Sequence, residues 1–532
     1  MQNKILLNWV IISILFLSAC AQIVSPTGGN KDDQNPFVIQ SEPRNQTTSF
    51  HSDKISILFN EYIELKHPEK VIVSPPFKEK LNVDYKGKEV IIDLKNHVID
   101  TSYTYTINLS GSVADVHEGL TLKNYTYSFT KNSYINKDSL FGRIEDAFSK
   151  KACKDFVIGL YEQTGFNDSL PFKKNPTYYG LVNDSGEFVI YNLPKNKFHV
   201  FCFHDINKNL KYDNNEDFGY IRNPIQVGEL NSILLRTNKP NLYADNKVLD
   251  KQKIGTNTYL ISIYRPKNLN IIPVNNDKIK IIQFLKEGLN DIDTLILNNE
   301  LKIKDSIIQI RIENKDTIEI VNHKPTRNKR PVIVNYSNLL KPEDSVVFTL
   351  NYPCKHINYN RIKLQQDSTI LPFQIRQINP IKYCVVFNKI EGKQYKLSFQ
   401  DSCFFSYEDE YNLSKQVDFK TLSSNQTGEI KLNIINSKQV PCLIYLVSNN
   451  EKEEIIEFIK NNTSEQVTLK YFNPGEYKVK IIVDSNRNGH WDKGEWFIKT
   501  EPEDVYYLKE IIGVRVLWEI EQTISIDFIV QK

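Results

Sequence analysis

The strongest chemical pattern in the sequence is a run of oxygen-bearing side chains between residues 484 and 495. They occupy positions 1, 3, 5, 9 and 12 of a twelve-residue stretch and are Asp484, Asn486, Asn488, Asp492 and Glu495. Alternate residues of a tightly curled loop point inward, and Ca²⁺ takes six to eight oxygen ligands. Gly489 suits the sharp turn at position 6, and His490 needs to supply only its carbonyl oxygen. Glu495 can close the site with its two carboxylate oxygens. The spacing therefore predicts a calcium site.

The same spacing occurs again between residues 205 and 216. Its oxygen-bearing side chains are Asp205, Asn207, Asn209, Asp213 and Glu216, and Lys211 stands where His490 stands in the other stretch. Position 6 differs, because Leu210 replaces glycine there. A side chain is strained at a positive φ, so this copy is expected to bend differently. Calcium affinities typical of extracellular modules are expected for both loops.

A hairpin loop rich in Asx turns is the alternative interpretation, since Asn-Gly is itself a turn signal. True EF-hands have helical flanks, whereas residues 198–203 and 477–483 alternate like strands. We therefore expect both loops at the ends of β-strands. Bound calcium would there stabilise the fold rather than sense a signal.

Catalytic motifs are missing from the sequence. It contains no HExxH, no GxSxG and no phosphate-binding glycine loop, and its nine histidines are scattered. His204 and His490 could be imagined as bases, but a strand-end residue and a carbonyl donor are the simpler interpretations. We therefore predict that the protein is not an enzyme. A hydrolase with an unrecognised site in the middle region stays open.

Three tryptophans, Trp491, Trp496 and Trp518, gather near the second acidic stretch. We expect them to close the edge of a β-sandwich. If they were exposed instead, they could stack on sugars.

The N-terminus has the pattern of an exported protein. Lys4 precedes an apolar run over residues 5–17, which is short for a membrane span. The run ends in Leu17-Ser18-Ala19-Cys20, which resembles the lipobox of bacterial lipoproteins. The resemblance implies a signal peptide over residues 1–19 and acyl chains, such as palmitate, on Cys20. Residues 20–35 are then the lipidated cysteine and a flexible tether. An ordinary signal peptide with an incidental cysteine is the alternative.

The composition predicts an all-β protein of tandem β-sandwich domains. Tyr and Phe number 28 each, and short Ile-, Val- and Thr-rich runs alternate with turn residues. The formal net charge of +3 gives no reason to expect nucleic acid as a partner. Six cysteines follow Cys20 without metal-like spacing, and we expect them to be buried free thiols.

Residues 36–132 resemble the bacterial Ig-like domain first described in S-layer proteins. The residues that carry this resemblance are 57–61, 101–107, Asp115 and 125–130. Together with Cys20 and residues 26–32, the chain resembles Ig-like-domain lipoproteins of Bacteroidota, which implies a lipid anchor at the outer membrane. Surface-exported lipoproteins of that phylum resemble one another in an acidic signal just after the lipidated cysteine, whereas the charged residues 31–33 lie well downstream of Cys20. Whether the protein faces the periplasm or the cell surface therefore stays open.

Residues 138–240 resemble carboxypeptidase regulatory-like modules, which are transthyretin-type sandwiches without peptidase activity. A β-rich domain of uncertain type is expected over residues 241–335 and a degenerate Ig-like domain over 336–423. A second regulatory-like sandwich is expected over 424–532, so the chain is an Ig-like and transthyretin-like pair, duplicated.

The leading hypothesis for function is a non-enzymatic cell-envelope lipoprotein that binds a protein partner, such as a subunit of an outer-membrane complex. A glycan-binding lipoprotein for polysaccharide uptake is the alternative.

Overall fold

The computed structural model describes most of the chain from residue 32 onward. The described residues are 32–230, 232–241, 246–253, 258–264, 271–274, 281–286, 292–299, 307–312, 317–321, 330–336, 338–351, 353–379, 381–407 and 410–528. Cys20 and the expected signal peptide lie outside them. Among these residues, no helix has the length and apolar character needed to cross a membrane.

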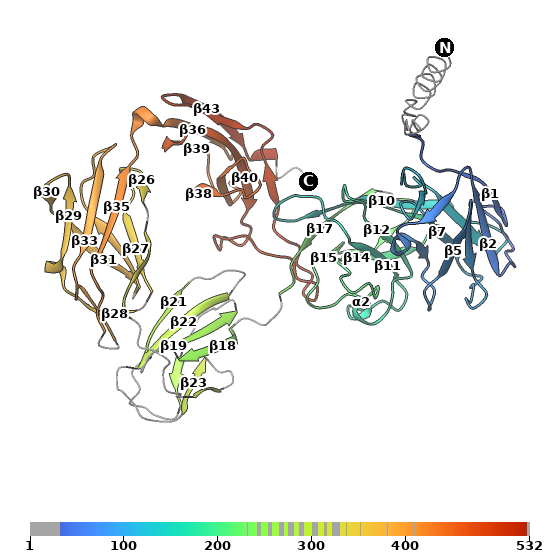
Figure 1. Cartoon of the computed structure of the whole chain (residues 1–532), viewed down its shortest axis with the longest axis horizontal. Helices are drawn as coiled ribbons and strands as arrows, with labels where there is room; N and C mark the ends of the chain where they lie inside the picture. Colours follow the sequence, from blue (N-terminus) through green and yellow to red (C-terminus); the bar gives the residue numbers. More distant parts are fainter. Residues whose placement is uncertain are drawn as a thin grey trace, which may run out of the picture. The chain divides into compact units, whose positions relative to one another are not determined.

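The described chain is a series of mostly antiparallel β-sheets, which confirms the all-β fold that the sequence predicts (Figure 1). Strand β2 (Lys54–Phe59) shows why, since Ile55, Ile57 and Phe59 are fully buried and alternate with more exposed residues. Alternate side chains of a strand point to opposite faces, so each such strand contributes one apolar face to a core.

The first domain has three small sheets around one core. Their orders are β1-β2-β6-β5, β4-β7-β9 and β3-β8. Besides β2, the elements are β1 (Val38–Glu42), β3 (Ile63–Leu65), η1 (Pro68–Lys70), β4 (Ile72–Ser74), β5 (Asn82–Lys86), β6 (Glu89–Asp93), β7 (Thr104–Asn108), β8 (Val113–Asp115) and β9 (Thr126–Thr130). Phe50, Tyr127 and Phe129 are among the large side chains that fill the core.

The next domain is built on an eight-stranded sheet. The order is β12-β11-β14-β15-β17-β10-β13, and β16 pairs with β14. The elements are β10 (Asp138–Asp146), β11 (Val157–Glu162), α2 (Leu170–Lys173), β12 (Tyr178–Leu181), β13 (Glu187–Leu193), β14 (Lys197–Phe203), β15 (Phe218–Tyr220), β16 (Ile225–Gln226) and β17 (Ser232–Asn238). Strand β14 leads into the first acidic loop.

The middle of the chain also forms strands, in two sheets of orders β18-β19-β22-β21 and β20-β23-β24. The strands are β18 (Lys247–Lys253), β19 (Thr258–Tyr264), β20 (Ile271–Pro273), β21 (Ile281–Lys286), β22 (Ile292–Asn299), β23 (Ile307–Ile312) and β24 (Thr317–Val321).

The fourth group of strands repeats the topology of the first domain. The sheets β25-β27-β32-β31 and β28-β34 correspond to β1-β2-β6-β5 and β3-β8, and β29-β33-β35 corresponds to β4-β7-β9. The elements are β25 (Ile333–Tyr336), β26 (Leu339–Leu340), β27 (Val346–Leu350), β28 (Cys354–Ile357), η2 (Tyr359–Arg361), β29 (Ile362–Gln366), β30 (Thr369–Leu371), β31 (Gln374–Asn379), β32 (Lys382–Val386), β33 (Gln394–Phe399), β34 (Phe404–Ser406) and β35 (Lys415–Thr421).

The last group repeats the topology of the second domain. The path β38-β37-β40-β41 corresponds to β12-β11-β14-β15, and β39-β36-β43 corresponds to β13-β10-β17. The elements are η3 (Ser424–Gln426), β36 (Gly428–Ile435), β37 (Cys442–Ser448), β38 (Ile455–Asn461), β39 (Glu465–Phe472), β40 (Gly475–Val483), β41 (Val505–Tyr507), β42 (Ile512–Val514) and β43 (Glu519–Ser525). Strands β14 and β40 therefore hold equivalent places, and each precedes an acidic loop.

The chain divides into two compact units. Unit 1 comprises residues 1–144, 152–212 and 220–235, and unit 2 comprises 145–151, 213–219 and 236–532. Cys354, Cys384, Cys403 and Cys442 are buried free thiols, as expected, and Cys202 is also buried, whereas Cys153 is half-buried.

Within unit 1, the first domain contacts strands β12 and β13 through polar groups. Asn192 donates from Nδ2 to Thr106 Oγ1 and to Ser128 Oγ, both at 2.7 Å. Ser74 Oγ accepts the N–H of Tyr179 at 2.9 Å. Thr106, Ser128 and Ser74 are buried, so these bonds tie the two domains at specific points.

Candidate functional site

The second acidic loop begins where β40 ends. Asp484 directly follows Val483, and its N–H donates to the carbonyl of Pro441 at 3.0 Å. Asp484 is 1 % exposed. The end of β40 thus places a carboxylate in the protein interior, where the sequence predicts position 1 of the loop.

The loop is organised by side-chain oxygens that accept backbone N–H groups. Asp484 Oδ2 accepts from Gly489, Asn486 Oδ1 from Asn488, and Asn488 Oδ1 from His490, each at 3.0 Å. The backbone has a positive φ of 86° at Gly489, where glycine carries no strain. The two asparagine bonds each reach the residue two positions on and are Asx turns, as the hairpin-loop interpretation predicts.

The first acidic loop uses the same bonds. Asp205 Oδ2 accepts the N–H of Leu210 at 2.9 Å, and Asn209 Oδ1 accepts that of Lys211 at 2.6 Å. Leu210 has a φ of 57°, so it takes the left-handed conformation that Gly489 also takes. The expectation of a different bend at Leu210 is therefore wrong, because the bond to Asp205 holds the leucine in this conformation.

The last two acidic residues of the first loop, Asp213 and Glu216, belong to unit 2. Glu216 is buried, and its Oε2 accepts the N–H of Asp213 at 3.0 Å. The acidic end of this loop is thus also stabilised by a backbone N–H group.

Glu503, which lies outside the twelve-residue pattern, ties two parts of the second loop together. The two carboxylate oxygens of Glu503 accept the N–H groups of Ser485 at 2.8 Å and Asp492 at 3.1 Å. Burial raises the pKa of Glu503, and the nearby Asp492 and Asp484 carboxylates raise it further. The Glu495 carboxylate instead accepts from Asn241 Nδ2 at 2.5 Å, and its main chain pairs with Thr500.

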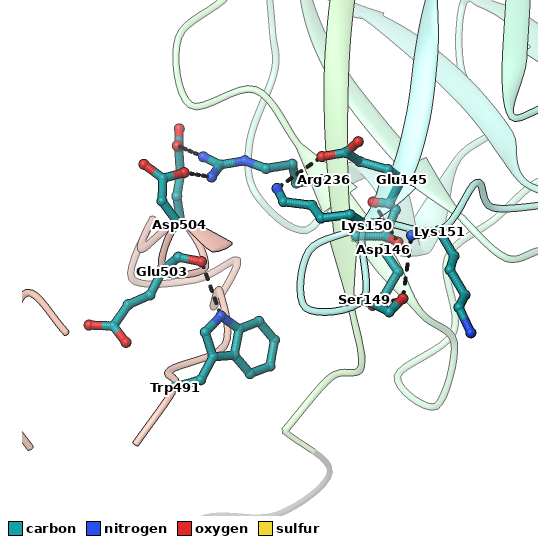
Figure 2. Close-up of polar contacts among 11 residues, drawn as sticks. Glu145, Asp146, Ser149, Lys150, Lys151, Arg236, Trp491, Glu503 and Asp504 are labelled. Atoms are coloured by element: carbon teal, nitrogen blue, oxygen red, sulfur yellow. Dashed lines mark hydrogen bonds and ion pairs between the residues drawn. The ribbon is translucent and has the colours of Figure 1, made fainter. Parts of the chain in front are cut away.

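Segments far apart in the sequence meet at this loop within unit 2. Figure 2 shows the guanidinium of Arg236 directed at Asp504, with which it forms an ion pair, and Arg236 also pairs with Glu501 at 3.0 Å. Trp491 donates its indole N–H to the carbonyl of Glu503 at 3.0 Å, and its ring centroid lies 5.0 Å from that of Phe148. The turn after β10 therefore contacts the second acidic loop.

A buried amide fixes the end of the loop. Asn238 Oδ1 accepts the N–H of Gly494, and Asn238 Nδ2 donates to the carbonyl of Gly494, both at 3.1 Å. A Cβ on Gly494 would lie 2.8 Å from Pro502 Cδ and 2.9 Å from Asn238 Oδ1. Only glycine fits this approach, a requirement that the sequence pattern alone did not reveal.

Lys480 is a buried cation on β40, next to the same turn. Its Nζ lies 3.3 Å from the centroid of the Phe148 ring and 5.3 Å from that of Tyr507. Burial lowers the pKa of Lys480 to about 8, although Glu453 and Asp146 oppose the shift. The aromatic faces partly replace the water that this ammonium has lost.

The three tryptophans differ in burial, which the sequence analysis expected for all of them. Trp496 is buried, as expected for a residue at a sandwich edge, and Trp491 is half-buried. Trp518 is 53 % exposed, so the expectation of burial is wrong for it. Its ring is covered by the Arg515 guanidinium, which lies 4.7 Å from the ring centroid.

The histidines considered as bases sit in local contacts. His204 stacks on Phe156 at 5.4 Å between ring centroids, and His490 Nε2 lies 3.7 Å from Asp492 Oδ1. Across the described residues, no three His, Cys, Asp or Glu side chains are grouped closely enough to hold a metal ion. Any cation at the second loop would therefore need amide and carbonyl oxygens as well.

Sequence reasoning missed Glu503, Arg236 and Asn238. Glu503 follows the twelve-residue pattern and returns to it because β41 pairs with β40. Arg236 and Asn238 come from the end of β17, more than 250 residues before their partners. The sequence held no local signal for these contacts.

Residues 32–131 match the family model of the bacterial Ig-like domain. No curated protein matches the sequence. Among solved structures, the major pilin subunit BcpA of Bacillus cereus is 10 % identical, with a TM-score of 0.14, over 73 % of this chain and 99 % of that one. Native alpha-2-macroglobulin from Escherichia coli is 9 % identical, with a TM-score of 0.18, over 34 % of this chain and 72 % of that one.

A further similar structure is SGBP-B of the Bacteroides ovatus mixed-linkage glucan utilization locus, in complex with a mixed-linkage heptasaccharide. It is 9 % identical, with a TM-score of 0.21, over 70 % of this chain and 94 % of that one. Similarity this low supports no argument about activity. The protein thus contains a bacterial Ig-like domain within a series of tandem β-sandwiches.

Proposed function

We propose that the protein is a non-enzymatic lipoprotein of the cell envelope, anchored at the outer membrane, whose β-sandwiches form a scaffold for a protein partner. The observation that carries this proposal is the contact in unit 1 between Asn192 and the buried hydroxyls of Thr106 and Ser128. A scaffold must hold its modules in a fixed geometry, and buried hydrogen bonds between domains supply that geometry.

The anchor in this proposal is Cys20. Support comes from the sequence Leu17-Ser18-Ala19-Cys20 after an apolar run, followed by residues suited to a tether. Acyl chains on Cys20 would hold the β-sandwiches at a membrane surface. We also assign the domains with the β14 and β40 topologies to the regulatory-like, transthyretin-type modules of Bacteroidota lipoproteins.

Mass spectrometry of the mature N-terminus tests the anchor. We expect acylated Cys20 as the first residue and recovery of the protein with the outer membrane. The Cys20→Ser variant should lose both properties. An unmodified cysteine, or the same membrane recovery for Cys20→Ser, would contradict the anchor.

Glycan binding is the alternative function, and exposed Trp518 is the observation that favours it. A half-exposed indole can stack on a sugar ring, although Arg515 already lies over this one. Electrophoresis in gels containing mixed-linkage glucan distinguishes the two. The scaffold proposal expects no retardation, whereas retardation that Trp518→Ala abolishes would favour glycan binding.

A further inference from the structure

We propose that the second acidic loop binds a hard divalent cation such as Ca²⁺, and that Glu503 rather than Glu495 closes the site. This inference is independent of the scaffold function. Its ligands would be the side-chain oxygens of Asp484, Asn486, Asn488, Asp492 and Glu503, together with the carbonyl oxygen of His490. It differs from the sequence prediction in the residue that closes the loop and in limiting the site to one loop.

The first observation is a buried carboxylate oxygen without a partner. Asp484 is 1 % exposed, and Oδ2 accepts the N–H of Gly489. Oδ1 is buried and has no hydrogen-bond partner among the residues that the structure describes. Since an unsatisfied buried charge is costly, this oxygen is a place where a cation would bind favourably.

The second observation is the set of oxygens around Asp484. Glu503 is tied to both ends of the loop, through the N–H groups of Ser485 and Asp492. Asn486 and Asn488 donate from Nδ2 to Asp492 Oδ2 at 2.5 and 2.6 Å, which holds Asp492 beside them. Each Asn Oδ1 accepts one N–H and keeps a second lone pair. Cation binding would draw Asp492 and Glu503 inward to complete the oxygen shell.

The two acidic loops differ at their first carboxylate. Both oxygens of Asp205 accept backbone N–H groups, Oδ1 from Asn209 at 3.0 Å and Oδ2 from Leu210 at 2.9 Å. Both carboxylate oxygens of Asp205 therefore have a hydrogen-bond partner, whereas Asp484 Oδ1 has none among the described residues. The same sequence pattern therefore gives a self-satisfied turn in the first loop and a candidate cation site in the second.

The protein's own cations are the competing explanation. Lys460 Nζ lies 3.6 Å from the place that a Cβ would take on Gly489, and His490 lies close to Asp492. Among the described residues, no ion pair joins Lys460 to Asp484. If Lys460 repels an incoming cation, Lys460→Met should tighten cation binding rather than abolish it.

Terbium luminescence tests the proposal on the full-length protein. Tb³⁺ is a hard cation that replaces Ca²⁺, and Trp491 lies beside Glu503, where it can sensitise the ion. Excitation at the red edge of tryptophan absorption avoids the tyrosines. We expect a saturable signal that Ca²⁺ displaces with a Kd of roughly 0.1–1 mM.

The matched variants are Glu503→Gln and Glu495→Gln, which remove the same charge from the two candidate closing residues. Glu503→Gln should weaken binding by about tenfold or more, and Glu495→Gln and Asp205→Asn should leave it unchanged. Lack of saturable binding by the wild type would overturn the proposal. Loss of binding in Glu495→Gln but not in Glu503→Gln, or loss in Asp205→Asn, would overturn the assignment of the site.

Calorimetric Ca²⁺ titration of the wild type and Glu495→Gln keeps the test decisive if Glu503→Gln does not fold. Equal melting curves of Glu503→Gln and wild type in EDTA show that it does fold. The proposal requires that both the wild type and Glu495→Gln bind Ca²⁺, whether or not Glu503→Gln folds.

Discussion

The side-chain amide of Asn238 forms two hydrogen bonds with the backbone of Gly494: it accepts the N–H and donates to the carbonyl, both at 3.1 Å. These residues are 256 positions apart, and Asn238 is 3 % exposed. The pairing is part of a set of contacts in unit 2 that hold the 484–504 segment against the end of β17. Its consequences can be measured one residue at a time.

Gly494→Ala should destabilise unit 2. The new Cβ would lie 2.8 Å from Pro502 Cδ and 2.9 Å from Asn238 Oδ1, so the backbone must shift and the amide pair must break. We expect a loss of roughly 1–3 kcal/mol in the free energy of unfolding, measured by urea denaturation. Gly513→Ala is the matched control, because nothing lies within 4 Å of its Cβ. Equal effects of the two substitutions would contradict the packing at Gly494.

Arg236→Lys should weaken the contact with the 484–504 segment even though it keeps the charge. The guanidinium pairs with Asp504 and Glu501 at once, and an ammonium cannot reproduce this fork. These carboxylates are partly exposed, so a cost of about 1 kcal/mol is expected for Arg236→Ala and less for Arg236→Lys. Hydrogen exchange of residues 484–504 should be faster in Arg236→Lys than in the wild type, and faster still in Arg236→Ala. Arg376→Ala, at an exposed position on β31, should not change exchange there.

Asn192→Gly should loosen the contact between the Ig-like domain and β13. Asn192 has a φ of 58°, which glycine adopts freely, so the substitution removes the side chain without adding strain. The buried hydroxyls of Thr106 and Ser128 would each lose a donor, at a cost of roughly 1–2 kcal/mol. Limited proteolysis between residues 131 and 138 should accelerate. A cleavage rate no faster than that of the exposed-site control Asn96→Ala would be evidence against a specific tie.

Lys480→Met should stabilise unit 2 at neutral pH and lose this advantage in alkali. The folded state lowers the pKa of Lys480 from 10.5 to about 8, so the unfolded chain binds the proton more tightly. The free energy of unfolding therefore rises with pH through that window, and this contribution disappears in the variant.

The charged groups around this ammonium are Glu453, Asp146, Lys150 and Lys151, and all of them remain in Lys480→Met. The difference in stability between variant and wild type should thus shrink between about pH 8 and pH 10. Urea denaturation across this range measures it. A difference that does not depend on pH would mean that Lys480 is well solvated in the folded protein.

Local patterns in the sequence predicted much of the fold, because short alternating runs such as β2 and β33 carry their own burial pattern. The pattern also placed both acidic loops at strand ends, where the structure has them. It could not predict that Glu503 would return to the loop, since that depends on the pairing of β41 with β40. Gly494 and Asn238 meet only through tertiary packing, which residue spacing does not encode.

We propose that the protein acts as a membrane-bound scaffold with a protein partner, and cross-linking in intact cells tests this. The cross-linked material is purified from membranes that carry the wild type or Asn192→Gly. We expect one discrete cross-linked assembly with a recurring envelope protein, in a smaller amount for Asn192→Gly at equal abundance of the chain. Recovery of the protein only as an uncross-linked monomer, or an assembly that neither Asn192→Gly nor Arg236→Ala changes, would rule out the scaffold.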